Sequence, residues 1–140
     1  MSSRNPVGRF FSLSAKEKKL FAEMALLVLW ADVLTLFPLR YYKRCIEHVS
    51  SRKTENEEEF IRLVKKTLSR IRKYWFKEIS CLAFSVATKK LLIRHGIPCI
   101  LCIGLKKDNN RLSAHAWTYY KDIILTGYIP SESYTLIATL

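Results

Sequence analysis

Apolar residues recur every three or four positions through the first half of the chain, and the second half contains shorter, continuous apolar runs. The first pattern is typical of helices that bury one face. It predicts three helices, from Ser14 to about Phe37, from Pro38 to about Val49 and from Thr54 to about Arg72. Ser14 with Glu17, and Thr54 with Glu57, match the capping box, in which a hydroxyl and a carboxylate bond free N–H groups at a helix start. We expect the polar, basic segment before Ser14 to be loose at its start.

The second half predicts a fourth helix followed by strands. Ser80 is a typical N-cap residue, so this helix begins at Cys81 and ends near His95, where Gly96 can adopt the left-handed conformation. The remaining runs predict a buried strand, a polar loop, a hairpin turning at Lys121-Asp122 and a last strand or short helix, at residues 97–105, 106–110, 112–128 and 131–140.

These elements make the fold class α+β. Helices come first in the chain, and an antiparallel sheet follows, on which the Cys81 helix lies. The chain has 140 residues, of which 49% are hydrophobic, enough for one domain with a core of its own. We expect a single domain over residues 1–140, with a helical part at 14–74 and a part carrying Cys81 and a later histidine at 75–140.

The net charge of +12 concerns partners more than fold. Much of it lies on the predicted helix ending at Arg72, which is either a solvated face or a surface that docks an acidic peptide or protein. No zinc-finger, RNA-binding or phosphate-loop motif accompanies the charge, so we expect no nucleic-acid partner. The apolar run from Leu20 to Phe37 is long enough for a membrane span, but Glu23 and Asp32 would be costly in a bilayer, so we expect no insertion.

The four cysteines do not form a dense secreted framework, and no secretory signal opens the sequence, so we expect a cytoplasmic protein with reduced thiols. Cys99 and Cys102 have the spacing of a redox or metal-binding pair. On a strand, residues three apart point to opposite faces, so we interpret both as core residues. No second pair of ligands exists, and we expect neither a metal nor a cofactor.

Cys81 and His115 are the candidate catalytic residues. The free N–H groups of a helix start carry partial positive charge, which favours an anionic sulfur at Cys81. His115 lies in the first strand of the predicted hairpin. A cysteine on a helix and a histidine on a strand, far apart in sequence, are the parts of a thiol nucleophile and its base. The alternative is that Cys81 is a small buried residue and His115 a half-buried histidine without a chemical role.

Several motifs in one order favour the catalytic interpretation. They are Ser80-Cys81-Leu82, His95-Gly96-Ile97-Pro98, Ile103-Gly104 and Ala114-His115-Ala116-Trp117. In this order, and with a capped apolar helix before them, the chain resembles the lasso-peptide leader peptidase, the transglutaminase-like C-terminal domain of the lasso-peptide B protein, in its stand-alone form. The resemblance covers most of the chain and implies a papain-like or transglutaminase-like core.

The resemblance also implies a cysteine peptidase that removes the leader from a ribosomally made lasso precursor peptide. Cys81 would form a thioester acyl-enzyme and His115 would be the general base. The family completes this pair with an aspartate, but the corresponding place here is Thr126-Gly127. Asp122 is the nearest acid, about 23 Å along an extended strand from His115. Glu132 is the other candidate for the third member.

The implied partners are the precursor peptide, a small leader-recognition protein and a macrolactam cyclase that closes the ring afterwards. We expect the recognition module to be a separate protein, docked on the apolar helix Leu20–Phe37 or the basic helix Thr54–Arg72. Three alternatives stay open: a transglutaminase-like acyl transferase, a non-enzymatic basic module that binds nucleic acid or membrane, and a structural protein.

Overall fold

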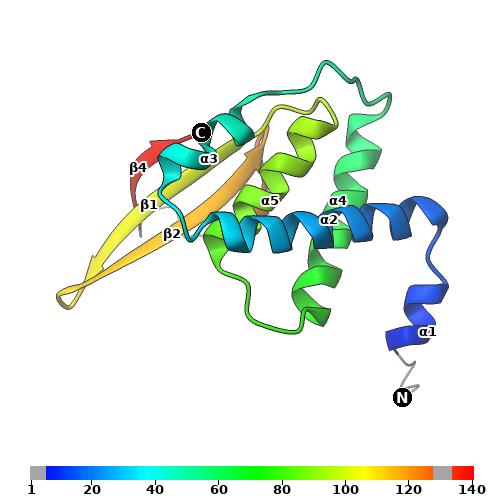
Figure 1. Ribbon diagram of the computed structural model, residues 1–140, viewed down its shortest axis with the longest axis horizontal. Helices are drawn as coiled ribbons and strands as arrows, with labels where there is room; N and C mark the ends of the chain where they lie inside the picture. Colours follow the sequence, from blue (N-terminus) through cyan, green and yellow to red (C-terminus); the bar gives the residue numbers. More distant parts are fainter. Residues whose placement is uncertain (1–5, 128–133) are drawn as a thin grey trace.

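A computed structural model describes residues 6–127 and 134–140 of the chain. It contains helices α1 (Pro6–Phe11), α2 (Ala15–Leu34), α3 (Leu39–Glu47), α4 (Glu57–Tyr74) and α5 (Cys81–Arg94), and strands β1 (Ile100–Asp108), β2 (Arg111–Tyr120), β3 (Ile123–Thr126) and β4 (Thr135–Thr139) (Figure 1). The helices precede the strands along the chain, so the predicted α+β class is confirmed.

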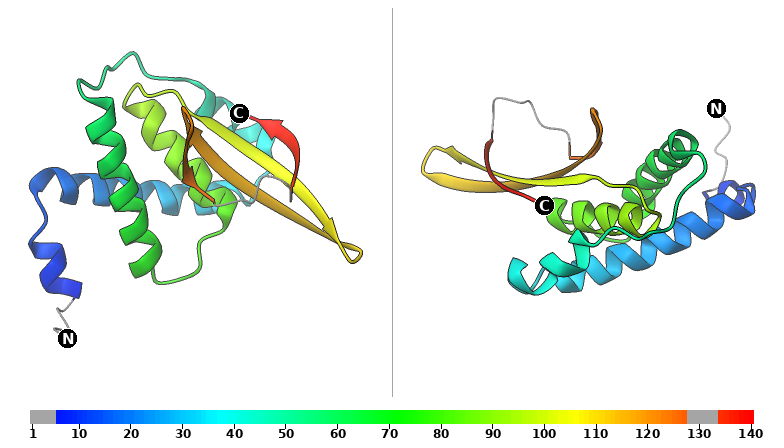
Figure 2. Two further views of the ribbon diagram at one scale, coloured as in Figure 1. Left: turned by 180° about the vertical axis from the view of Figure 1, so that it is seen from behind. Right: turned by 90° about the horizontal axis from the view of Figure 1, so that it is seen from above.

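The four strands form one antiparallel sheet in the order β3-β2-β1-β4. Helix α5 lies along one face of this sheet, and α2 lies on the side of α5 that is turned away from the sheet (Figure 2). The core fills these layers with fully buried side chains such as Met24 and Val28 of α2, Leu91 and Leu92 of α5, and Leu101 of β1. The central helix α5 is therefore packed on both sides, and its position is fixed by the sheet and by the other helices.

The predicted cap of α2 is confirmed. The Ser14 hydroxyl accepts from the N–H of Glu17 at 3.3 Å, and the Glu17 carboxylate accepts from the N–H of Ser14 at 3.0 Å. The helix ends at Leu34, earlier than the predicted Phe37, and the N–H groups of Leu36 and Phe37 bond carbonyl oxygens three residues back in a tighter turn that leads into Pro38. Pro38 itself is the N-cap of α3 and does not lie inside its first turn.

One expectation about the helix caps is wrong. Asn56 caps α4, accepting from the N–H of Glu59 at 3.2 Å, whereas the Thr54 hydroxyl donates to the carbonyl oxygen of His95 at 2.7 Å. A contact distant in sequence therefore decides the role of Thr54.

The segment before Ser14 contains the short helix α1, whose Phe10 packs edge-on against Phe21 with ring centroids 5.5 Å apart. The start of this segment, which was expected to be loose, lies outside the described residues.

The sheet contains more of the chain than the sequence predicted. β1 continues through Lys106–Asp108, which was expected to be a loop, and turns at Asn109 and Asn110 with φ angles of 45° and 63°. Asparagine tolerates this conformation, which two-residue hairpin turns require. The turn at Lys121-Asp122 is confirmed by the pairing of Tyr120 with Ile123. The tail forms β4, which pairs with β1.

The connection between α5 and β1 depends on a glycine. Gly96 has a φ of +74°, as predicted for the cap, and a Cβ there would lie 1.5 Å from the carbonyl oxygen of Arg52. Any larger residue would therefore push the Ser50–Thr54 segment away from the end of α5. Among the described residues, no helix combines the length and the apolar character needed to cross a bilayer.

Candidate active site

Cys81 is the first residue of α5, as predicted. The hydroxyl of Ser80 accepts from the N–H of Ala83 at 3.1 Å, and the carbonyl of Ser80 accepts from the N–H of Phe84 at 3.0 Å. The side chain of Cys81 is half-buried, so part of it is in contact with solvent. At this position the N–H of Cys81 itself is free of the helix ladder and could donate to a developing oxyanion.

Buried hydroxyl groups join α5 to β2 and β3. The hydroxyls of Ser85 and Thr126 lie 2.9 Å apart, and the hydroxyl of Thr118 donates to the carbonyl oxygen of Ser85 at 3.3 Å. Ser85 is one helical turn after Cys81, so both residues share the face of α5 that meets the sheet. These hydrogen bonds fix the position of the first turns of α5 along strands β2 and β3.

Cys81 and His115 come to the same level along β2. Ser85 lies beside Thr118, and the other end of α5 leads directly into β1, whose Ile100 pairs with Tyr119. Cys81 is four residues before Ser85, which is about 6 Å along the axis of α5. This distance corresponds to about two residues of a strand. Cys81 is therefore level with Ala116, the neighbour of His115.

The imidazole of His115 lies on the other face of the sheet. Thr118 bonds α5 and Ala116 is buried in the core, so strand alternation turns His115 and Trp117 away from α5. The His115 ring stacks on Tyr134, with centroids 5.3 Å apart. Its Nε2 atom is buried and has no hydrogen-bond partner among the described residues, so this nitrogen does not pair with the thiol.

Gly127 contacts the histidine where the third member was expected. Its φ is +67°, and a Cβ there would lie 3.1 Å from Nε2 of His115 and 2.7 Å from the carbonyl oxygen of Ala116. The backbone thus passes so close to the ring that no side chain fits between them. Packing by Gly127, Tyr134 and Trp117 holds the imidazole in this orientation.

Of the two acids named as candidate third members, the structure describes only Asp122, and it does not lie near His115. Asp122 is exposed in the turn between β2 and β3. Seven residues of strand separate it from His115, which is about 23 Å. Glu132 lies outside the described residues.

Burial lowers the pKa of His115, and the positive charge of Arg72 lowers it further. Both effects disfavour the imidazolium, so the ring is neutral near pH 7 and able to accept a proton. Arg72 is at the end of α4, with its guanidinium 5.1 Å from the centre of the Phe84 ring in the first turn of α5. Arg72 therefore packs on the first turn of α5, which carries the thiol, and its charge lowers the pKa of His115.

The other cysteines and histidines are less suited to this chemistry. Burial raises the pKa of Cys99 to about 11 and also raises that of Cys102, which keeps both thiols protonated. His95 lies 3.2 Å from the Glu23 carboxylate. In residues 6–127 and 134–140, no group of three or more potential ligands is placed to hold a metal ion.

Comparison with known sequences decides the family. A sequence model described as the transglutaminase-like superfamily matches residues 24–139, which is most of the chain. The chain belongs to the transglutaminase-like superfamily. No curated protein and no solved structure matches it significantly. Transglutaminase-like domains are typically cysteine-based enzymes, so the matched region provides a context for the thiol at the start of α5.

Sequence reasoning missed two residues that shape the surroundings of His115. Arg72 was predicted only as one cation among many on a basic helix, and nothing in its sequence neighbourhood indicated an effect on His115. Gly127 was noted as the place where an acid was missing. Its φ and its contact with the imidazole depend on how the chain leaves β3, which a single sequence does not reveal.

Proposed function

We propose that this chain is a cysteine peptidase that removes the leader from a ribosomally made lasso precursor peptide. The observation that carries the proposal is the position of Cys81. Its half-buried thiol lies in the first turn of α5, which Ser80 caps and which packs on the sheet of a transglutaminase-like domain. The resemblance of the motifs around Cys81 and His115 to leader peptidases supplies the substrate class.

The reaction begins when the Cys81 thiol gives its proton to the neutral His115 imidazole and the sulfur adds to the carbonyl carbon of the scissile peptide bond. The new oxyanion is placed near the N–H of Cys81. The C–N bond then breaks, and the leaving amine takes the proton from the His115 imidazolium, leaving a thioester. Next, a water molecule gives a proton to His115 as its oxygen bonds the acyl carbon. The C–S bond breaks, which releases the carboxylic acid, and the imidazolium returns its proton to the sulfur.

The proposal requires His115 to approach the thiol when substrate binds. The two residues are level along β2, and catalytic hydrogen bonds are often long or misaligned before substrate is bound. Here the ring must also leave its stack on Tyr134 and turn toward α5. The ladder between β2 and β3 ends at Thr118, so β3 does not hold the segment of β2 that carries His115. β1 does pair with this segment, with Gly104 opposite His115, and the movement has to open that pairing.

Partners follow from the same proposal. The precursor would be presented by a separate leader-recognition protein, and a macrolactam cyclase would use the cleaved product. A stripe of exposed apolar residues on α2, formed by Leu26, Leu29 and Val33, supports docking of a partner on that helix. The basic face of α4 is the second candidate surface.

The proposal is tested by incubating the chain with a lasso precursor and its recognition protein and detecting the leader and the core by mass spectrometry. Cys81→Ala is expected to abolish cleavage and to retain the fold. Cys45→Ser is the matched control, because that cysteine is exposed on α3 and has no role in the mechanism. Cleavage by Cys81→Ala at the wild-type rate would remove the thiol mechanism.

Membership of the transglutaminase-like superfamily also favours a second candidate, transfer of the acyl group to an amine. The steps up to the thioester are the same. An added primary amine would then appear in the product as an amide, whereas a peptidase yields the free acid. The mass of the product with and without the amine distinguishes the two reactions.

A further inference from the structure

A cavity of about 700 Å³ lies between α1, the first turns of α2 and the C-terminal half of α4. Its apolar lining is mainly aromatic and consists of Val7, Phe10, Phe11, Leu13, Phe21 and Tyr74. The volume is within the range of about 300 to 1,000 Å³ found for sites that enclose a ligand. Neither Cys81 nor His115 contributes to the lining, so the cavity is separate from the candidate active site.

The apolar side chains around this cavity are poorly covered by the rest of the protein. Phe11 is 70% exposed and Val7 is 64% exposed, and Phe10 and Tyr74 are exposed as well. Single exposed apolar residues are common, but several of them around one hollow are typical of a binding surface. Covering them would remove apolar area from water and stabilise the complex.

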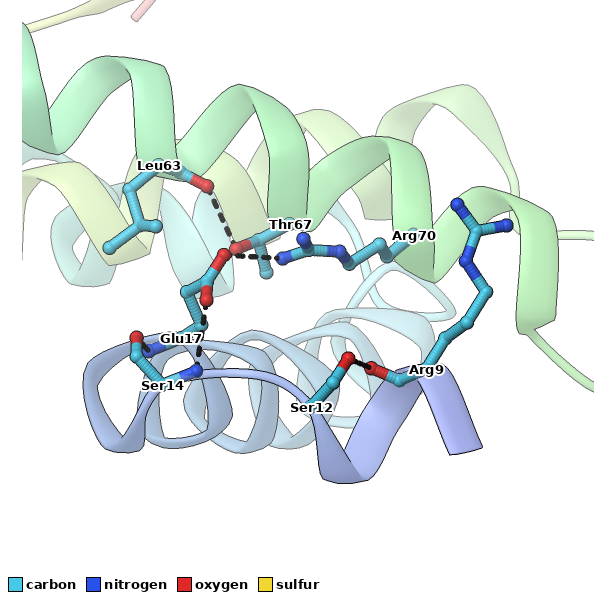
Figure 3. A network of polar contacts seen from close by, with 7 residues as sticks. All are labelled: Arg9, Ser12, Ser14, Glu17, Leu63, Thr67 and Arg70. Carbon is cyan, nitrogen blue, oxygen red and sulfur yellow. Dashed lines mark hydrogen bonds and ion pairs between the residues drawn. The ribbon is translucent and has the colours of Figure 1, made fainter. Parts of the chain in front are cut away.

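The polar groups at the cavity are basic. The charge of Arg70 is neutralised by Glu17. The guanidinium donates a hydrogen bond to the Glu17 carboxylate at 3.2 Å (Figure 3). Arg9 extends from α1 toward α4 in the same view. Arg9 and Lys73 have no ion-pair partner among residues 6–127 and 134–140, and no described carboxylate lines the cavity. An acidic occupant would therefore be attracted.

Two of the three walls lie outside the region that matches the family. The match begins at residue 24, whereas α1 and the first turns of α2 precede it. The cavity is thus formed by packing an additional segment against α4, and the fold of the shared domain does not account for it.

We propose that this cavity docks a segment of another polypeptide, in which bulky apolar residues are flanked by acidic residues. The apolar side chains would pack among Phe10, Phe21 and Tyr74, and carboxylates on either side would pair with Arg9 and Lys73. These cations come from different walls, one from α1 and one from α4, so an occupant with acids on both sides satisfies them. A fatty acid, with one carboxylate, would satisfy only one of them. The docking does not depend on the peptidase activity.

The test uses the full chain carrying Cys81→Ala, so that no turnover interferes, and a fluorescein-labelled peptide with the sequence Asp-Glu-Leu-Phe-Asp-Glu. Fluorescence anisotropy is expected to show saturable binding that weakens with salt. The double variant Arg9→Glu/Lys73→Glu should weaken binding by about tenfold or more, since two attractions become repulsions. Arg44→Glu/Lys107→Glu makes the same change of charge at exposed positions outside the cavity and should bind as the parent chain does.

Two further ligands complete the experiment. The peptide Asp-Glu-Ser-Ser-Asp-Glu keeps the charge and loses the apolar side chains, and it should bind more weakly than the first peptide. Dodecanoate tests a free amphiphile as the occupant. The proposal is overturned if the first peptide fails to bind, if both double variants weaken it equally, if the serine peptide binds as tightly, or if dodecanoate binds and the peptide does not displace it.

Discussion

At the residue scale, the proposed chemistry depends on a neutral imidazole. His115 is surrounded by Tyr134, Trp117 and the backbone of Gly127, and Nε2 is buried there without a hydrogen-bond partner among residues 6–127 and 134–140. An unpaired buried polar atom costs stability, so its retention is typical of a group kept for function. A substrate-induced movement of the ring would release this cost.

The lowered pKa of His115 predicts how stability depends on pH. The folded protein binds this proton less readily than the unfolded chain, so protonation favours unfolding. The stability contributed by the neutral ring is therefore present above about pH 6.5 and is lost as the pH falls through the lowered pKa. Urea unfolding at about pH 7.5 and about pH 5.5 measures this loss.

His115→Gln is expected to lose less stability between those two pH values than the wild type. Arg72→Gln removes one of the two causes of the shift and should give an intermediate loss, whereas Arg62→Gln, exposed on the same helix, should behave as the wild type does. An equal loss in wild type and His115→Gln would show that the imidazole is not held neutral by the fold.

At the element scale, the site depends on how α5 is placed on the sheet. Three buried side chains make this contact polar, since Ser85 of α5 bonds Thr126 of β3 and accepts a bond from Thr118 of β2. The same contact sets the level of Cys81 relative to His115. Polar groups in a core specify one alignment, because any other alignment leaves them unpaired.

Removing one partner of the Ser85–Thr126 pair should therefore cost more than removing both. Ser85→Ala leaves a buried hydroxyl unpaired and is expected to lower the free energy of unfolding by about 1 to 3 kcal/mol. Adding Thr126→Val should recover part of that loss. Urea unfolding of both single variants and the double variant measures the coupling, with the exposed Ser113→Ala as control. Additive losses would contradict the role given to this pair.

The elements that the sequence predicted best are those with local signals. Ser14, Ser80 and Gly96 act within a few residues of their own position, and all three caps are confirmed. Thr54 carried the same type of signal, but its hydroxyl bonds the distant carbonyl of His95 and leaves the capping role to Asn56. Local patterns fail where a tertiary contact competes for the same group.

The candidate site was predictable in part for the same reason. The place of Cys81 at a helix start follows from Ser80, and the strand around His115 follows from its aromatic and apolar neighbours. Which face of that strand meets α5 depends on packing across the sheet, and the sequence did not reveal that His115 and Cys81 lie on opposite faces. The position of Gly127 against the imidazole likewise depends on the bulge between β2 and β3.

At the scale of the whole molecule, a three-layer domain carries two separate features. One is the half-buried thiol of a transglutaminase-like domain, and the other is a basic, aromatic cavity built partly from residues that precede the family match. The net charge of +12 favours association with acidic polypeptides. An enzyme that receives its substrate from a partner needs both a reactive group and a docking surface.

The formation of a thioester on Cys81 is the most direct test of the proposed mechanism. The chain is incubated with a lasso precursor and its recognition protein, the reaction is stopped with acid, and intact-protein mass spectrometry with peptide mapping locates any adduct. We expect a transient acyl adduct on Cys81 that disappears as the product accumulates and that is absent from Cys81→Ala. Cleavage without an adduct, together with undiminished cleavage by Cys81→Ala, would show that no thioester forms on this residue.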